Sequence, residues 1–116
     1  MSAAFENLVI DGDTGRATVR RDHLVHLCEG HFPGDPLVPG AYLAGLMADV
    51  GWAVVVARVR AAVLAGIERC VFLAPVRPGR DVAVSVEHDG AGRVLAEIRV
   101  DGASAARAVL RFRIPR

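Results

Sequence analysis

One short segment of the chain places a histidine beside an unusually constrained backbone. Residues 30–40, GHFPGDPLVPG, contain one histidine, three prolines and three glycines. Because proline fixes φ and glycine adopts conformations closed to other residues, we expect a rigid loop here. The loop carries His31 near its start and opens a helix around Gly40, where the first backbone N–H groups lack partners within the helix. An imidazole beside such groups can remove a proton next to a carbonyl while the N–H groups stabilise the enolate.

The longer segment GHFPGDPLVPGAYLAGLMA carries a family resemblance. It resembles the signature of the β-hydroxyacyl-[acyl carrier protein] dehydratases, the FabZ/FabA group of the hot-dog fold, which reads approximately H-F-x-G-x-P-x-x-P-G-x-x-x-x-[ED]. A second segment, AGIERCVFLAPVRPGRDVAVSVE, is similar to the family's G-I-x-x-x-x-F-x-x-P-V-x-P-G-D. The resemblance covers most of the chain, from about residue 5 to about residue 114.

The resemblance implies an α+β hot-dog domain, in which an antiparallel sheet wraps around one long central helix. It also implies a dimer with composite active sites and a substrate carried on an acyl carrier protein. By position, His31 is the base that removes the α-proton, and the Gly40 N–H holds the thioester carbonyl. Phe32 and Tyr42 are expected to contact the substrate, although large residues on a buried helix, such as Tyr42 and Trp52, more often pack in the core. No cofactor is expected, because the thioester itself acidifies the α-carbon.

The family's catalytic carboxylate does not carry over, because its position holds Gly45. The nearest acidic residue on the expected helix is Asp49, on the same face and about 6 Å further along the axis. An apolar environment would raise the pKa of Asp49 and keep it protonated, as an acid requires. Asp49 also stands where the family usually has a hydrogen-bonding Gln, so a structural role is an equal alternative. Further sources of the proton are Asp35, a bound water and a residue of a different partner chain.

Other residue groups indicate other chemistries less strongly. HLVHLCEGH brings His23, His26, Cys28 and His31 together, and all are zinc-ligand types. One short extended loop is poorly suited to arranging four ligands tetrahedrally, so we expect no metal site. No sequence feature marks Cys28 as an activated nucleophile.

Four arginines are candidates for contact with a carrier protein. Arg77 and Arg80 precede a predicted strand, and Arg58 and Arg60 lie at the predicted helix end. They either meet the acidic surface of an acyl carrier protein, which would mainly speed encounter, or are ordinary surface residues.

The elements that must position these residues follow from the pattern of apolar residues and turn formers. β-favouring runs flank DGDTG near the start and predict a hairpin. AYLAGLMADVGWAVVVARVRAAVLA has few helix breakers and exceeds a normal strand, so it predicts the long helix. Four β-rich runs follow, at 67–76, 81–89, 93–101 and 103–114, separated by turn formers. The predicted order is two strands, one helix and four strands, in a single domain spanning 1–116.

Composition and charge exclude several classes of function. The chain has 116 residues, of which 53% are hydrophobic, and a formal net charge of +1. Charges of both signs are spread along it, so no nucleic-acid partner is expected. The apolar run 41–57 lies at the lower edge of a membrane span, but Asp49 sits near its middle and two glycines interrupt it. We therefore expect no membrane insertion, and a helix buried between the sheet and a partner subunit.

Cysteine content and the start of the chain bear on the compartment. With two cysteines, Cys28 and Cys70, and no secretory signal, a reduced, cytoplasmic protein is the expectation. A disulfide between the two stays open, because the sequence does not give their separation.

The leading functional hypothesis is dehydration of β-hydroxyacyl thioesters on an acyl carrier protein to trans-2-enoyl thioesters. The setting is fatty-acid or polyketide and polyene biosynthesis, and the altered carboxylate position favours the specialised routes slightly. The main alternative is a catalytically incomplete hot-dog subunit that binds acyl carrier protein and pairs with a second hot-dog chain. Gly45 motivates this alternative, since such a partner could supply the carboxylate. An acyl thioesterase is a further alternative.

Overall fold

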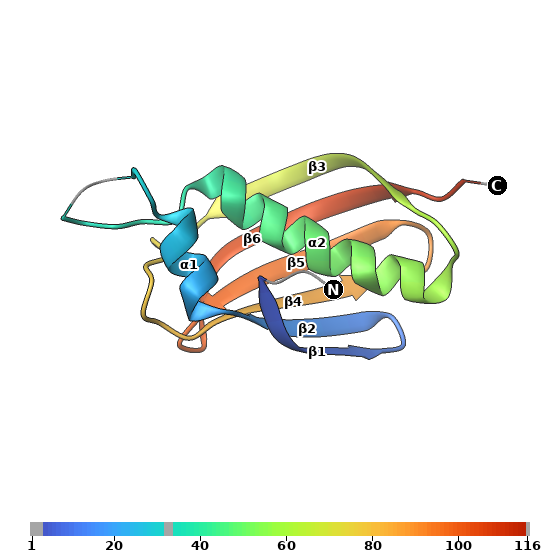
Figure 1. Ribbon diagram of the computed structural model, residues 1–116. Helices are drawn as coiled ribbons and strands as arrows, with labels where there is room; N and C mark the ends of the chain where they lie inside the picture. The colour runs from blue at the N-terminus through green and yellow to red at the C-terminus, as the bar shows by residue number, and fades with distance from the viewer. Residues whose placement is uncertain (1–3, 32–33, 116) are drawn as a thin grey trace.

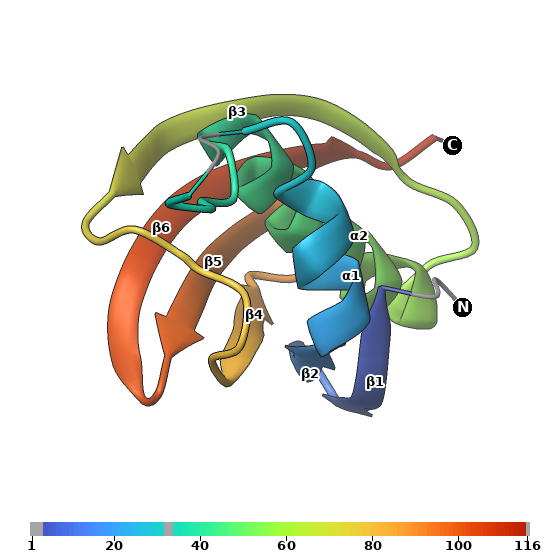
Figure 2. The same cartoon turned by 60° about the vertical axis from the view of Figure 1, so that its left-hand side comes forward.

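The computed structural model describes residues 4–31 and 34–115 and contains one six-stranded antiparallel sheet. The strand order in the sheet is β1-β2-β4-β5-β6-β3. The sheet curves around a long helix, α2, that lies across its concave face (Figures 1 and 2). Along the chain the elements are β1 (Phe5–Asp11), β2 (Thr14–Val19), α1 (Arg21–Leu27), α2 (Gly40–Arg58), β3 (Val63–Phe72), β4 (Val82–His88), β5 (Arg93–Val100) and β6 (Ala103–Arg113).

This architecture confirms the predicted hot-dog fold, with two differences in its helices. Arg21–Leu27, expected as part of an extended loop, forms the short helix α1. The long helix ends at Arg58, where Val59 turns extended, and β3 begins at Val63, four residues before the predicted strand. The alanines between them favour helix, but pairing of Val63 with Arg113 of β6 draws this segment into the sheet.

Helix α2 buries one face and exposes the other. Its buried residues recur at helical spacing and pack on the sheet: Leu43, Leu46, Met47, Val50, Gly51, Val54 and Val55. By length and composition α2 could cross a membrane, but this buried stripe is what the core helix of a folded domain requires. The opposite face carries Tyr42, Gly45, Asp49 and Trp52, which are all exposed and which we call the exposed stripe of α2.

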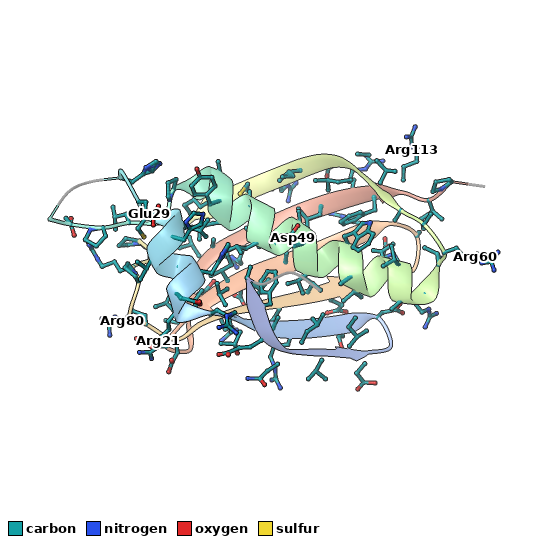
Figure 3. The ribbon with its side chains drawn as sticks, viewed as in Figure 1. Arg21, Glu29, Asp49, Arg60, Arg80 and Arg113 are labelled. Atoms are coloured by element: carbon teal, nitrogen blue, oxygen red, sulfur yellow. The ribbon has the colours of Figure 1, made fainter. Side chains whose placement is uncertain are left out.

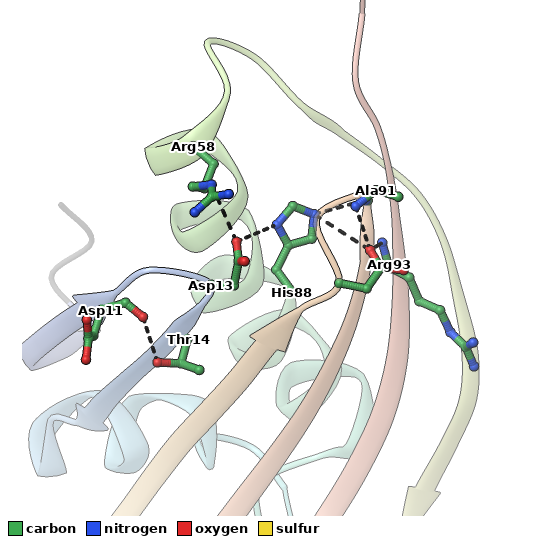
Figure 4. Close-up of polar contacts among 9 residues, drawn as sticks. Asp11, Asp13, Thr14, Arg58, His88, Ala91 and Arg93 are labelled. Atoms are coloured by element: carbon green, nitrogen blue, oxygen red, sulfur yellow. Dashed lines mark hydrogen bonds and ion pairs between the residues drawn. The ribbon is translucent and has the colours of Figure 1, made fainter.

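A polar cluster around the buried His88 links the C-terminal end of α2 to the hairpin turns of the sheet (Figure 4). The side chain of His88 is 1% exposed, and its Nε2 accepts a hydrogen bond of 2.9 Å from the Gly92 N–H. Asp13 Oδ1 lies 3.7 Å from His88 Nδ1 and 3.6 Å from Arg58 Nε. Because Nε2 accepts the hydrogen bond from Gly92, the imidazole carries its N–H on Nδ1, which faces Asp13. This cluster positions turns far from His31, so its role is structural.

The edge strand β3 is unusually apolar for a solvent-facing edge. Six large apolar side chains of β3 and the residue after it are 39–51% exposed: Val63, Leu64, Ile67, Val71, Phe72 and Leu73. The opposite edge, β1, exposes two such side chains, Val9 and Ile10. An exposed, apolar edge strand has free backbone donors and acceptors that pair readily with another strand.

Candidate active site

The site begins with His31, which follows α1 in a tight turn. The His31 N–H donates to the Cys28 carbonyl oxygen over 3.0 Å, and Gly30 adopts a φ of +75°, which favours glycine. The imidazole lies nearly parallel to the ring of Tyr42, with an interplanar angle of 16° and ring centroids 6.1 Å apart. The turn after α1 thus brings His31 to the first turn of α2. Phe32, the other predicted contact in this loop, lies outside the described residues.

The start of α2 offers free N–H groups beside His31. Tyr42 and Leu43 donate their N–H groups to the Pro39 carbonyl oxygen, whereas within the described part of the chain the Gly40 N–H has no partner. None of the described side chains caps this helix end. The Gly40 N–H can therefore donate to a ligand oxygen, with the positive end of the helix dipole behind it.

Position 40 favours glycine because the ring of Phe72 lies against it. A Cβ built on Gly40 would come within 2.8 Å of Phe72 Cζ and 3.0 Å of Cε2, closer than side chains approach. Phe72 is at the end of β3, so this contact links the edge strand to the helix start.

Two open cavities meet at this helix start. One, of about 550 Å³, is lined by Gly30, His31, Leu37, Val38, Pro39 and Gly40. The other, of about 450 Å³, shares Leu37, Val38 and Gly40 and extends along Leu43 and residues 72–76. The first brings the imidazole and the helix N-terminus to one space, and the second is lined by apolar side chains. A groove of about 590 Å³ lies on the outer face of the sheet, away from His31.

The proline- and glycine-rich loop is fixed to the segment between β3 and β4. The Val38 N–H donates to the Val76 carbonyl oxygen over 2.8 Å, and the Asp35 carboxylate forms an ion pair with Arg77. Asp35 is therefore engaged in holding the loop. Sequence reasoning could not find this pair, because its members are 42 residues apart.

The position of the missing carboxylate is open space. Nothing lies within 4 Å of a Cβ built on Gly45. Asp49, one turn further along, is exposed midway along α2 (Figure 3). Partial burial of its carboxyl raises the pKa of Asp49, and the charge of nearby His23 on α1 opposes that shift. Asp49 therefore has the raised pKa expected of an acid, but its charged neighbour is His23 and not His31.

The residues considered for metal binding and nucleophilic chemistry take other positions. His23 and His26 lie on α1 with ring centroids 6.0 Å apart, and His26 pairs with Glu29. Among the described residues, no group of three or more His, Cys, Asp or Glu side chains converges to hold a metal ion. Cys28 and Cys70 are free thiols, and burial raises the pKa of both. A raised thiol pKa disfavours the nucleophilic thiolate.

The four arginines considered for a carrier protein do not form one patch. Arg77 pairs with Asp35, Arg80 with Asp101, and Arg58 lies 3.6 Å from Asp13. Arg80 and Arg60 lie at opposite ends of the molecule, and Arg113 lies at the same end as Arg60 (Figure 3).

Comparison with known sequences identifies related dehydratases. The family model described as ApeI-like, ApeI dehydratase, matches residues 10–108. The 3-hydroxyacyl-[acyl-carrier-protein] dehydratase FabZ of Latilactobacillus sakei is 32% identical over 94 residues, covering 72% of this chain and 66% of that protein. FabZ of Pelotomaculum thermopropionicum is 42% identical over 64 residues, covering 51% and 45%. The chain spans 41–66% of the length of the curated relatives it matches.

Solved structures share the fold at low sequence identity. The dehydratase heterocomplex ApeI:P from Xenorhabdus doucetiae superposes with a TM-score of 0.74 at 16% identity, covering 97% of this chain and 98% of that one. A thioesterase from Haemophilus influenzae superposes with a TM-score of 0.73 at 18% identity, covering 93% and 76%. Since both dehydratases and thioesterases have this fold, the fold alone does not choose between the two reactions.

Proposed function

Because the chain belongs to the ApeI-like dehydratase family, we propose that it dehydrates β-hydroxyacyl thioesters on an acyl carrier protein to trans-2-enoyl thioesters. The observation that carries this proposal is the cavity shared by His31 and the N-terminus of α2 at Gly40. A base and an oxyanion donor facing one space are what α-proton removal from a thioester needs.

In the proposed reaction, His31 is the neutral base and Gly40 provides the oxyanion donor. The imidazole takes the α-proton while the Gly40 N–H donates to the thioester oxygen, on which negative charge develops. The electron pair then forms the Cα=Cβ bond, and the β-hydroxyl leaves as water after taking up a proton. The adjoining cavity, with Leu37, Leu43 and Phe72 in its wall, suits the acyl chain.

Two residues of this chain are candidates for donating the proton to the leaving β-hydroxyl of the substrate. Asp49 is the carboxylate on the exposed stripe of α2, and its raised pKa supports an acid. If it acts, it acts from a partner protomer, because along the helix axis it is about 14 Å from Gly40 of its own chain. Tyr42 is the second candidate and is argued below.

The exposed surface supports pairing with another hot-dog subunit. The apolar edge of β3 would add a second strand, and the exposed stripe of α2 would be covered by the partner. A two-fold axis perpendicular to the sheet makes two copies of β3 antiparallel, so the Val63 end of one strand meets the Phe72 end of the other. This arrangement brings Arg60 and Arg113 of one protomer towards the partner's site, where they could meet an acidic carrier protein.

A second candidate function is favoured by Gly45. This chain has no carboxylate at that position, so a different hot-dog chain could supply one across the interface to the site of His31. A heterocomplex of this kind is named for the structural relative ApeI:P. In this case the chain is one half of a dehydratase.

The test is a product analysis with the purified chain. Incubate it with a 3-hydroxyacyl thioester on acyl carrier protein, and measure the conjugated enoyl thioester by ultraviolet absorbance and free thiol with a thiol reagent. We expect enoyl product without thiol release. Activity that appears only after addition of a second hot-dog chain would support the half-site function. Thiol release without enoyl product would contradict dehydration and identify a thioesterase.

A further inference from the structure

Tyr42 stands beside the base with a free hydroxyl. Its ring is nearly parallel to the imidazole of His31, with centroids 6.1 Å apart, and the residue is 45% exposed. Among the described residues its hydroxyl has no hydrogen-bond partner, since only its backbone N–H is engaged, with Pro39. A phenol is a proton donor at neutral pH, so Tyr42 offers a donor next to the proposed base.

The neighbouring glycine leaves the face of α2 beside this phenol open. Tyr42 and Gly45 are three residues apart and therefore lie on one face of α2. Nothing lies within 4 Å of a Cβ built on Gly45, so no described side chain fills the space where a carboxylate is missing. Side chains on a helix lean towards its N-terminus, which points Tyr42 back towards Gly40.

The position of the leaving hydroxyl also favours Tyr42 over Asp49. The hydroxyl is carried two carbons from the thioester carbonyl, whose oxygen the Gly40 N–H holds in the proposed mechanism. Its proton donor must therefore lie close to the start of α2. Along the helix axis Tyr42 is about 3 Å from Gly40, whereas Asp49 of the same chain is about 14 Å from it, so only the Asp49 of a partner protomer competes with Tyr42 as the donor.

We propose that Tyr42 replaces the missing carboxylate and donates its phenolic proton to the departing β-hydroxyl, within the same protomer as His31. This inference rests on the proposed dehydration. His31 takes the α-proton as the C–H bond breaks, the electron pair forms Cα=Cβ, and the Cβ–O bond breaks. The oxygen takes the phenolic proton and leaves as water. Transfer of a proton from the imidazolium to the phenolate, directly or through that water, restores both groups.

The test compares Tyr42→Phe, Tyr42→Leu and Asp49→Asn in the full chain. Phe keeps the ring and removes the hydroxyl, whereas Leu also removes the stacking on His31. With a 3-hydroxyacyl N-acetylcysteamine thioester, we expect Tyr42→Phe to lower kcat for dehydration by about 100-fold or more with little change in KM. Asp49→Asn tests the competing donor, and if Tyr42 donates the proton this variant lowers kcat far less than Tyr42→Phe does.

A second readout separates the donor from the base. Exchange of the α-hydrogens of a saturated acyl thioester in D₂O, followed by mass spectrometry, needs the base and the oxyanion donor but no leaving-group proton. We expect Tyr42→Phe to retain this exchange and to lose dehydration. Loss of both reactions would mean that Tyr42 acts only through His31, which would overturn the donor role.

Two further outcomes would overturn the inference while leaving dehydration intact. Full activity in Tyr42→Phe with a loss only in Tyr42→Leu would assign the ring a packing role. A large loss in Asp49→Asn with none in Tyr42→Phe would assign the proton to the carboxylate. If the unmodified chain shows neither dehydration nor exchange, the proposed function itself fails, and this inference fails with it.

Discussion

At the scale of single residues, the position of the proposed oxyanion donor depends on the close contact of Phe72 with Gly40. We expect Gly40→Ala to lower kcat/KM by about 10- to 100-fold, because a new Cβ, 2.8 Å from Phe72 Cζ, would push the ring aside and shift the helix start by a fraction of an ångström. Steady-state kinetics with the enoyl thioester measures this.

The matched control for this variant is Gly45→Ala, in the same helix but in open space. It should retain full activity if the family carboxylate position plays no part in this chain. Unchanged kinetics in Gly40→Ala would contradict the importance of the Phe72 contact.

Site residues could be predicted from the sequence where they belong to one continuous motif, but not where their contacts join separate segments. His31 and Gly40 follow from one continuous motif, and both line the same cavity. The stacking of Tyr42 on His31 could not be predicted, because it depends on where the turn after α1 delivers the imidazole. The pairing of Asp35 with Arg77 joins distant segments and leaves no local signal.

At the scale of elements, alanine substitution at two glycines of α2 tests which face of the helix packs on the sheet. Gly45→Ala should raise the free energy of unfolding by about 0.5–1 kcal/mol, because alanine favours helix and its Cβ meets nothing. Relative to Gly45→Ala, Gly51→Ala should be less stable by about 1–3 kcal/mol, because its Cβ would lie 3.1 Å from Leu110 Cδ1 and 3.4 Å from Val94 Cγ1. Urea unfolding of the two variants measures the difference. Equal effects would mean that α2 does not pack on the sheet as described.

The raised pKa of Asp49 makes a prediction about stability and pH. Because burial raises that pKa, the folded chain binds the proton more tightly than the unfolded chain, so ionisation at neutral pH costs stability. Asp49→Asn should therefore melt at a higher temperature than the unmodified chain at pH 7. The gap should narrow as the pH falls through the folded pKa, which lies above 3.8. A gap that is absent at pH 7, or that widens towards acid pH, would contradict the shift.

Helices and strands could be predicted from the sequence where the pattern of apolar residues extends over many positions. The four C-terminal strands and the long helix follow from apolar runs and turn formers, and the structure confirms them. The helix α1 was missed because its seven residues are too short for a periodic signal and bury only Leu24. The predicted helix extends past Arg58, where α2 ends, because the alanine-rich segment after it leads into the strand that pairs with β6.

At the scale of the whole molecule, the exposed apolar edge of β3 is the surface that we expect to bind a partner subunit. If two copies pair through β3 as proposed, the unmodified chain should be a dimer and Ile67→Lys a monomer, because a charge at an edge strand opposes strand pairing. Light scattering after size exclusion measures the mass. Leu95→Lys is the matched control, since Leu95 is 53% exposed but lies on β5, a central strand that is paired on both sides. A dimer that persists in Ile67→Lys would move the interface elsewhere.

The proposed dehydration requires His31 to remove the α-proton. The reverse reaction, hydration of an enoyl thioester, is compared for the unmodified chain and His31→Gln, with circular dichroism to verify the fold. We expect a loss of about 100- to 10,000-fold in the variant with its fold retained. Equal rates for the two proteins would show that His31 is not the base.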